Sequence, residues 1–316
     1  MLVIEAAEIR ARLTYDICIP LIRETMTRLS QGVTRQLLRS ILPLEGERLF
    51  GVMPGALGGD QPFGAKLVSV FPQNVARGGQ SHQGIVVLFD ATTGAPVCVV
   101  DAGEVTAIRT AAASAVATEV LARPDARRLA IIGSGEQARN HALAIALVRS
   151  LEAVTIWARN PQRAEHCAQQ VSRTLKIPVE VCDGAEEAVS EADIICTVTA
   201  AHEPVLLGRW VRAGAHVNVV GSSYAGPVEV DSELVVRSRF IADFREGVLA
   251  QGAEFLAAKA ASLVADDHVV GEIGEVLLGR LAGRRTPAEI TVYKSLGHIV
   301  QDLAVAQWLF ASHRAT

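Results

Sequence analysis

The stretch LAIIGSGEQARNH, residues 129–141, decides the fold, because it reads as a buried strand, a glycine turn and the start of a helix. Residues 133–138, GSGEQA, fit the pattern G-x-G-x-x-A, in which one glycine permits a tight turn and the next lets the backbone approach a pyrophosphate. The amino end of a helix favours negative charge, so the loop predicts a dinucleotide-binding site. An ordinary glycine turn in an α/β domain is the alternative. The residues assigned to the site are Gly133, Gly135, Glu136 and Gln137.

The residues that follow this loop alternate between strand-like and helix-like runs. Such alternation is typical of the α/β class, with a parallel, doubly wound sheet of the Rossmann type. Pro161 supports this reading because proline is favoured at the first position of a helix. The expected strands cover 153–160, 179–182, 193–199, 215–222 and 239–243, and the expected helices cover 161–175 and 184–192.

The chain before the loop has a different pattern. Its first 30 residues carry apolar side chains at helical spacing, with Gly32 as the stop. Short strands bounded by glycine and proline are expected from about residue 36 to residue 100, with a hairpin that turns at residues 92–94. An alanine-rich helix is expected over 103–122, since alanine is the strongest helix former.

The last segment, residues 290–313, predicts a strand-like start and a long amphipathic helix. Its partner is not settled by the pattern alone. Together with the resemblance described below, these sequence patterns predict two domains. A substrate-binding and dimerisation domain of the α+β type is expected over residues 1–117, joined by 290–316, and an NADP-binding Rossmann domain is expected over 118–289.

The end of the second expected strand indicates which dinucleotide is preferred. An NAD site usually has an acid there that binds the ribose 2′-hydroxyl. This chain has Ala158, Arg159 and Asn160 instead, and a guanidinium can pair with a 2′-phosphate. We therefore expect these residues to favour NADPH, with NADH possible but weaker. The alternative is that Arg159 is a solvated surface residue.

Composition excludes several classes of protein. The 316 residues are 50% hydrophobic and carry a formal net charge of −4, with no basic tail or stripe, so neither nucleic acid nor a membrane surface is an expected partner. No signal peptide and no apolar run long enough for a membrane span are seen, and a cytoplasmic protein is expected. The five cysteines are far apart and predict buried, reduced thiols. No metal site is expected, because His82 lacks a partner at ligand spacing.

Three cations interrupt apolar segments of the first domain. They are Arg39 in LLRSILP, Lys66 in FGAKLVSVF and Arg109 in VTAIRTAAAS, and they are expected to have no acid nearby in that domain. Burying an unpaired charge is costly, so each side chain is either exposed or holds an anion. For each cation alone, exposure to solvent is favoured. For the three together, binding of a carboxylate or phosphate ligand is as well supported as exposure.

At this point the motifs resemble those of the ornithine cyclodeaminase/mu-crystallin family. The matching pieces occur in order along most of the chain, and they include SHQGIVVLFDATTG, VDAGEVTAIRTAAASAVAT, IIGSGEQA, TVTAAHEPVL, GAHVNVVGSS and VYKSLGHIVQDLAVA. The resemblance implies a Rossmann domain inserted in a substrate and dimerisation domain, to which the terminal helix returns. It also implies a homodimer joined through an intersubunit β-barrel.

The resemblance assigns further residues. Arg39, Lys66 and Arg109 match positions that hold a substrate carboxylate, in agreement with the charge argument. Lys294 and Ser295 match a segment that closes over the site. Ser81, His82 and Thr110 match positions near the nicotinamide half of the cofactor. The further residues expected at the cofactor are Val198, Thr199, Ser223, Lys294 and Ser295.

One position departs from the cyclodeaminase pattern. Family cyclodeaminases and alanine dehydrogenases carry an aspartate shortly after the glycine of the VVG strand, and here Ser223 stands at that position. Ketimine reductases of the mu-crystallin type also have serine there. The resemblance therefore implies NADPH-dependent reduction of cyclic ketimines, namely 1-pyrroline-2-carboxylate to L-proline and 1-piperideine-2-carboxylate to L-pipecolate, within proline metabolism. Lys66, Arg109 and Ser223 are the expected catalytic residues.

Two alternatives stay open. One is a cyclodeaminase of ornithine or lysine, or an alanine dehydrogenase. The other is a protein that binds NADPH and a small carboxylate without turnover. The four glutamates Glu229, Glu246, Glu254 and Glu275 have no assigned role and are expected on solvated faces.

Overall fold

Two compact units make up the chain in the computed structural model, which describes residues 1–46, 48–77 and 81–314. Unit 1 comprises Met1–Arg109 and His298–Thr316, and unit 2 comprises Thr110–Gly297. Both boundaries differ from the expected ones, so that unit 2 is larger at each end. The reason at the second boundary is that the strand at 290–294 pairs within the parallel sheet of unit 2.

Unit 1 is built on a mixed sheet with the strand order β1-β7-β6-β5-β4-β2, and β3 also pairs with β4. Neighbouring strands are antiparallel except β1 and β7, which are parallel. Its elements are β1 (Leu2–Ile4), α1 (Ala6–Arg12), α2 (Tyr15–Ser30), β2 (Arg35–Gln36), β3 (Ser40–Pro43), β4 (Leu49–Ala56), β5 (Phe63–Val70), η1 (Pro72–Arg77), β6 (His82–Phe89), β7 (Pro96–Asp101) and α11 (Ile299–Arg314).

The local sequence accounts for the turns of this sheet. The predicted hairpin joins β6 to β7, where the Asp90 carboxylate accepts hydrogen bonds from the amides of Thr92 and Thr93. Gly94 completes the turn with φ +70°, a conformation that costs glycine little. Gly32 likewise ends the second helix with φ +73°. The expectation of helix from the first residues onward is wrong at Leu2–Ile4, which pairs with β7.

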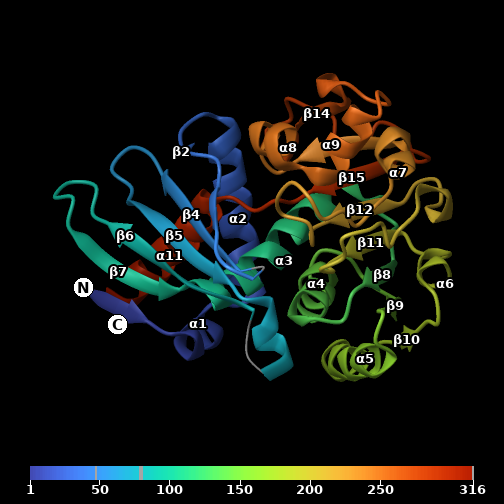
Figure 1. Cartoon of the computed structure of the whole chain (residues 1–316), viewed down its shortest axis with the longest axis horizontal. Coiled ribbons are helices and arrows are strands. Elements are labelled where there is room, and N and C mark those ends of the chain that lie inside the picture. The colour runs from blue at the N-terminus through green and yellow to red at the C-terminus, as the bar shows by residue number, and fades with distance from the viewer. Residues whose placement is uncertain (47, 78–80, 315–316) are drawn as a thin grey trace. The chain divides into compact units, whose positions relative to one another are not determined.

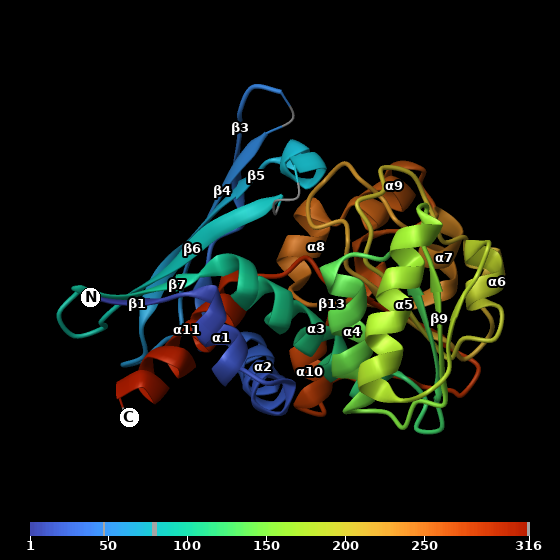
Figure 2. The same cartoon turned by 90° about the horizontal axis from the view of Figure 1, so that it is seen from below.

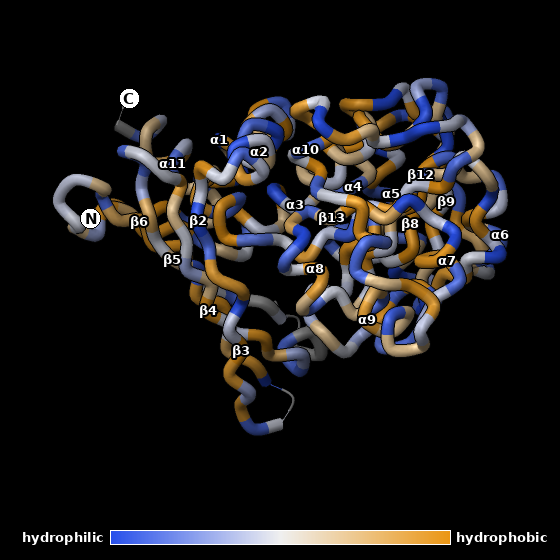
Figure 3. The backbone as a smooth tube through the Cα atoms, turned by 90° about the horizontal axis from the view of Figure 1, so that it is seen from above, coloured by the Kyte–Doolittle hydropathy of each residue, from blue (hydrophilic) through white to orange (hydrophobic). Residues whose placement is uncertain are grey.

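The two faces of this sheet differ in burial. Lys66, Val86, Val100 and Ile4 lie in register on one face and are buried there. Helices α1, α2 and α11 lie on one side of the sheet in Figure 2, and α11 contacts β4, β5 and β6. The opposite face is apolar and partly exposed, and hydrophobic segments run along β3 and β4 in Figure 3. Its exposed apolar side chains include Val3 at 58% and Phe63 and Ile85 at 39%.

Unit 2 confirms the predicted doubly wound fold. Its strands are all parallel in the order β10-β9-β8-β11-β12-β15-β13-β14, and Figure 1 labels all of them except β13. The chain enters it through α3 (Ala102–Leu121), which begins in unit 1. The strands are β8 (Arg128–Ile132), β9 (Ala153–Trp157), β10 (Val179–Val181), β11 (Ile194–Thr197), β12 (His216–Val219), β13 (Ser238–Ala242), β14 (Val269–Glu272) and β15 (Ile290–Lys294). The helices are α4 (Glu136–Ala146), α5 (Pro161–Leu175), α6 (Ala185–Val189), η2 (Gly208–Trp210), α7 (Ser232–Arg237), α8 (Arg245–Gln251), α9 (Ala253–Ala260), η3 (Asp266–His268) and α10 (Ile273–Leu277).

Both faces of this parallel sheet are buried. Along β8, Leu129 and Ile131 join one hydrophobic core with residues of α4 and α5, whereas Ala130 and Ile132 join a second core on the other face. Parallel sheets are covered on both faces, which is why their strands read as continuous apolar runs. The apolar run of β8 therefore serves both cores and places the glycine turn at the carboxyl edge of the sheet.

Candidate functional site

The glycine turn has the shape that close approach of a ligand requires. Gly133 has φ +132°, and a Cβ there would lie 2.9 Å from the carbonyl oxygen of Val198. Gly135 is the N-cap residue of α4, and a Cβ there would meet no heavy atom within 4 Å. The first glycine is thus required by the fold, and the second leaves open space above the amino end of a helix. Such an end attracts anions, so the residues present fit a dinucleotide pyrophosphate.

The position of this turn in the sheet agrees with its shape. From β8 the chain continues to β9 and β10 on one side of the sheet, and from β11 onward it builds the other side. Open α/β sheets bind ligands outside the carboxyl ends of the strands where the order reverses. The neighbours across this switch point are Gly133 after β8 and Val198 after β11, whose amide donates to Ile132 O at 2.9 Å.

The end of β9 carries the residues expected to choose between dinucleotides. Arg159 is exposed. Asn160 is the N-cap of α5, and its Oδ1 accepts a hydrogen bond from the amide of Arg163 at 3.0 Å. The cap turns the chain directly after Arg159, so this residue lies between the carboxyl end of β9 and the amino end of α5.

A buried carboxylate, Glu229, ties together the ends of β11 and β12. It is 0% exposed, so its expected place on a solvated face is wrong. It accepts hydrogen bonds from the amide and hydroxyl of Thr199 at 2.6 and 2.8 Å, from the hydroxyl of Thr197 at 2.9 Å, and from the amide of Gly221. Burial raises the pKa of Glu229, while these donors and the Lys294 charge oppose that shift.

A second buried acid, Glu254 of α9, extends this arrangement to β15. It is 1% exposed, which again contradicts the solvated face expected from sequence. Its Oε1 accepts from the amide of Glu229 at 3.1 Å and from the hydroxyl of Ser222, and its Oε2 lies 2.7 Å from the Lys294 ammonium. Burial acts to raise the pKa of Glu254, but Lys294 and these donors outweigh it and the pKa is lowered.

In unit 1, two of the three predicted cations meet at one acid. The ammonium of Lys66 lies 3.1 Å and Nε of Arg109 lies 3.2 Å from Oδ1 of Asp302, and all three side chains are at most 5% exposed. Arg109 also donates to Oε1 of Gln301 at 2.9 Å. The premise that no acid lies nearby is therefore wrong, because α11 brings Asp302 to β5 from a distant part of the sequence. The same signal would have found it, since Asp302 interrupts the apolar run HIVQDLAVA.

The cluster still carries excess positive charge. Burial lowers the pKa of Lys66 to about 8, and although Asp302 opposes the shift, the charges of Arg109 and Arg39 add to it. Arg39 is half-buried in the loop between β2 and β3. Lys66 and Arg109 thus share a single carboxylate in the described part of this unit. That balance is suited to a second carboxylate supplied by a ligand.

The remaining predicted residues are placed with less detail. Thr110 is 8% exposed and Ser295 is 2% exposed, and their hydroxyls have no hydrogen-bond partner among the described residues. Ser81 precedes β6, and its carbonyl accepts from the amide of Phe71 at 2.8 Å. The side chain of His82 lies outside the described part of the chain. A cofactor contact for these four residues stays a prediction.

The family model for ornithine cyclodeaminase and mu-crystallin matches residues 1–316. The chain belongs to this family. Among its relatives is the Delta(1)-pyrroline-2-carboxylate reductase of Bacillus cereus, 34% identical over 312 residues, which cover 98% of this chain and 96% of the relative. Ketimine reductase mu-crystallin of Mus musculus is 35% identical over 301 residues, covering 94% and 92%.

A solved structure of another protein shares this fold over nearly its full length. It is the Thermococcus litoralis Delta(1)-pyrroline-2-carboxylate reductase in complex with NADH and L-proline. The TM-score is 0.97 at 32% identity, and the match covers 100% of this chain and 98% of that one. The likeness confirms the α/β Rossmann-type fold that the sequence predicts.

Ser223, at which the resemblance predicts a departure from the cyclodeaminase pattern, follows directly on the residues that Glu254 and Lys294 hold. It is half-buried in the loop after β12, next to Ser222, whose carbonyl accepts from the Lys294 ammonium at 2.7 Å. Lys294 is 0% exposed and is held by Ser222 and Glu254. Its ammonium therefore acts on the loop that carries Ser223, and a direct contact with the cofactor stays a prediction.

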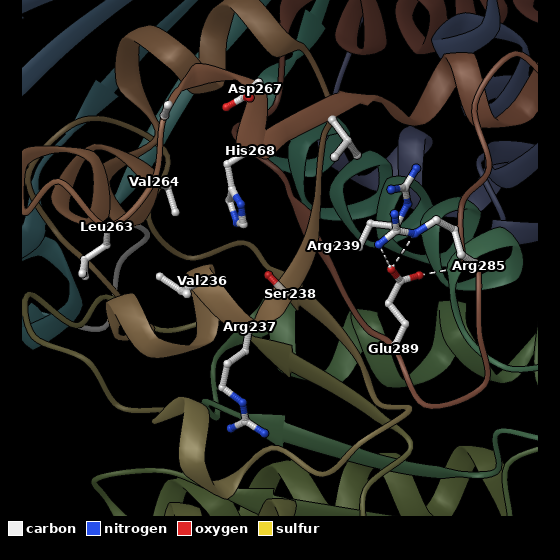
Figure 4. Close-up of a pocket in the computed structure, with 12 residues that line it drawn as sticks. Val236, Arg237, Ser238, Arg239, Leu263, Val264, Asp267, His268, Arg285 and Glu289 are labelled. Atoms are coloured by element: carbon white, nitrogen blue, oxygen red, sulfur yellow. Dashed lines mark hydrogen bonds and ion pairs between the residues drawn. The ribbon is translucent and has the colours of Figure 1, made fainter.

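A pocket of about 490 Å³ lies elsewhere in unit 2, at the amino ends of β13 and β14. Figure 4 shows Val236, Leu263 and Val264 on one side of it, with Arg239, Arg285 and Glu289 on the other. These charges are already used, because Arg285 pairs with Glu289 at 2.6 Å and Arg239 donates to the carbonyl of Ala282 at 2.7 Å. The pocket is at the opposite end of the strands from the glycine turn and does not belong to the candidate site.

The described residues hold no sign of a metal site or of a membrane span, and their cysteines are unpaired. No group of three or more histidine, cysteine, aspartate or glutamate side chains is placed to hold a metal ion there. The described helices include none that is both long enough and apolar enough to span a bilayer. All five cysteines are free and buried, which confirms that expectation.

Proposed function

We propose that this protein reduces cyclic ketimines with a nicotinamide cofactor, converting 1-pyrroline-2-carboxylate to L-proline and 1-piperideine-2-carboxylate to L-pipecolate. The observation that carries the proposal is the buried pair of cations, Lys66 and Arg109, which lie beside Asp302. Their two positive charges exceed the single negative charge of this carboxylate, which suits them to bind a substrate carboxylate as well. Unit 1 then serves substrate binding and unit 2 serves cofactor binding. The family relatives that are named as reductases of such imines support this choice.

The chain's own residues position the reactants. Lys66 and Arg109 bind the substrate carboxylate, with Arg39 adding positive charge, and this orients the C2 carbon of the imine. The cofactor, when bound, supplies the hydride. Because the imine nitrogen is already protonated, little acid–base catalysis is required, and orientation alone is worth roughly 7–11 kcal/mol. In this proposal Ser223 is a neutral neighbour of the reaction and not a base.

The deciding experiment compares two substrates. Conversion of ornithine needs ring closure by a neutral amine, for which a carboxylate base typically contributes about 10²–10⁴-fold. A serine hydroxyl at position 223 cannot accept a proton at neutral pH, so we expect no appreciable ammonia from L-ornithine with NAD⁺ or NADP⁺. Clear NADPH oxidation is expected with 1-pyrroline-2-carboxylate, followed by absorbance. Ser223→Asp should slow the reductase, since a new anion competes with the substrate carboxylate for the cations.

Either alternative has its own signature in these assays. Ornithine turnover faster than ketimine reduction would replace the reductase by a cyclodeaminase. Tight NADPH binding with no oxidation of any tested ketimine would leave a binding protein without turnover. L-lysine and L-alanine belong in the same screen.

NADPH is the proposed cofactor, with NADH weaker. Arg159 is exposed at the end of β9, and no acid stands beside it to bind a ribose hydroxyl. We expect Arg159→Ala to lose about 10- to 100-fold in NADPH affinity, as for a charge-assisted hydrogen bond, and to change NADH affinity little. Fluorescence titration with both cofactors measures this. Equal affinity of the wild type for NADH and NADPH would remove the proposed role of Arg159.

We also propose a homodimer formed through the sheet of unit 1. Val3, Val99, Val87 and Ala65 are neighbours in register on its partly exposed face. Contiguous exposed apolar surface on a sheet is typical of an interaction site. Sedimentation equilibrium measures the mass, and a monomer at micromolar concentration would contradict this assembly.

A further inference from the structure

The buried charges of unit 2 form one connected network of Glu229, Glu254, Lys294 and Ser222, hereafter the Glu254 network. Each of the four side chains is at most 1% exposed. Through hydrogen bonds and one ion pair they join the ends of β11, β12 and β15 to helix α9. Burying two acids and one ammonium is costly, and replacing such groups by apolar ones is often neutral or stabilising. Stability alone therefore explains their presence poorly.

The network fixes the backbone of two loops at the carboxyl edge of the sheet. Glu229 holds the amides of Thr199 and Gly221, and Lys294 holds the carbonyl of Ser222. A Cβ on Gly221 would lie 2.1 Å from the carbonyl oxygen of Thr199 and 2.5 Å from Oε1 of Glu229, so the two loops approach as closely as glycine allows. Neither loop can shift without breaking these bonds.

These loops lie next to the glycine turn. β11 pairs with β8 on one side and with β12 on the other, and a Cβ on Gly133 would lie 2.9 Å from the carbonyl oxygen of Val198. A dinucleotide whose pyrophosphate rests on the α4 amino end extends from there across the ends of neighbouring strands. Arg159 lies at the end of β9, on the opposite side of β8, and it fits the adenosine half. The nicotinamide half is then left to the ends of β11 and β12.

We propose that the Glu254 network is a positioning device that presets the loops at Thr199 and Gly221–Ser223 for the nicotinamide half of the cofactor. Glu254 and Glu229 are thus positioning residues that act through backbone and through Ser222. The inference rests on the proposed function for the identity of the cofactor. It does not depend on which imine is reduced.

The test separates the two halves of the cofactor by binding alone. NADPH is compared with 2′-phospho-ADP-ribose, which lacks only the nicotinamide, by calorimetric titration of the full-length protein. In Glu254→Gln the charge that holds Lys294 is lost, so NADPH binding should weaken about tenfold or more, the size expected for misplaced contacts. Binding of 2′-phospho-ADP-ribose should change less than about twofold, since the substitution disturbs contacts to the nicotinamide half and leaves the contacts to the adenosine half intact.

A matched control lies on the same helix. Lys259 of α9 pairs with Asp266 at 2.5 Å, but both side chains are about half exposed, at 44% and 53%. Lys259→Ala should bind both ligands as the wild type does. If Glu254→Gln does not fold, Ser222→Ala carries the test, because it removes only the hydroxyl and keeps the Glu254–Lys294 pair. It should show the same selective loss.

Equal weakening of both ligands, or no weakening of either, would overturn the positioning role. With any ketimine that proves to be a substrate, kcat of Glu254→Gln should fall more than KM rises. Absence of ketimine turnover in the wild type would reject the proposed function. The binding comparison would still show whether the Glu254 network positions the nicotinamide half of the cofactor.

Discussion

Arg109→Ala is expected to lower kcat/KM for 1-pyrroline-2-carboxylate by about 10- to 200-fold, the equivalent of a charged hydrogen bond worth about 1.5–3 kcal/mol. The guanidinium is 4% exposed and oriented by Asp302 and Gln301, so its remaining donors are preorganised for a carboxylate. Lys66→Ala should have an effect of the same size. Steady-state NADPH oxidation over a range of ketimine concentrations measures both variants.

Two controls limit the interpretation of that result. NADPH affinity of Lys66→Ala should be nearly unchanged, since the ammonium is bound to Asp302 within unit 1. Arg127→Ala removes an arginine whose pair with Glu152 is exposed at 55% and 59%, and it should leave kcat/KM unchanged. Full activity in both Arg109→Ala and Lys66→Ala would exclude the cations from substrate binding.

Asp302→Asn is expected to be the most damaging of the single changes to stability. Its carboxylate is 0% exposed and lies within 3.2 Å of two buried cations. Removing one partner of a buried ion pair leaves charge uncompensated and costs about 3–5 kcal/mol. A lowered urea midpoint at matched protein concentration measures this, whereas Asp125→Asn, at a side chain 75% exposed, should leave the midpoint nearly unchanged. An unaltered midpoint in Asp302→Asn would show that the cations are not held as a buried cluster.

The same variant should change the pH dependence of activity. Lys66 must be charged to bind a carboxylate, and burial lowers its pKa to about 8, so kcat/KM should fall as pH rises through that value. Asp302 raises the pKa of Lys66, while Arg109 and Arg39 lower it. With Asp302 neutralised, the alkaline limb should move to lower pH than in the wild type. Comparing the two profiles with one substrate cancels the titration of the imine itself, and coincident profiles would exclude Lys66 as the titrating group.

The parts of the fold that could be predicted are those set by local pattern. The β8 run and its glycine turn identify the parallel sheet, and the hairpin at residues 92–94 follows from its turn residues. The strand β14 was missed because VVGE is short and carries a glycine at φ +157°. The strand β15 was expected with the first domain because nothing local distinguishes a strand that joins one sheet from a strand that joins another.

The candidate site shows the same division. Lys66 and Arg109 could be found because each interrupts an apolar run, but their partner Asp302 lies more than 190 residues from both in sequence. Only the packing of α11 on the sheet brings them together. An acid can be buried only where other parts of the chain supply hydrogen-bond donors to it. The donors to Glu229 and Glu254 are not visible in the local sequence, which is why solvated faces are expected for both acids. A rule that treats charges in apolar runs as a set, whatever their sign, would have included Asp302.

The order of the chain has a consequence for how it is made. Residues 110–297 precede residues 298–314 in the chain, so every strand of the Rossmann sheet leaves the ribosome before the helix α11 does. Until α11 arrives, Lys66 and Arg109 lack the carboxylate of Asp302, and the buried face of their sheet lacks the helix that contacts β4, β5 and β6. The cluster of Lys66, Arg109 and Asp302 can therefore form only after α11 has left the ribosome, and a chain truncated after residue 297 would keep every strand of the Rossmann sheet but lack the acid of this cluster.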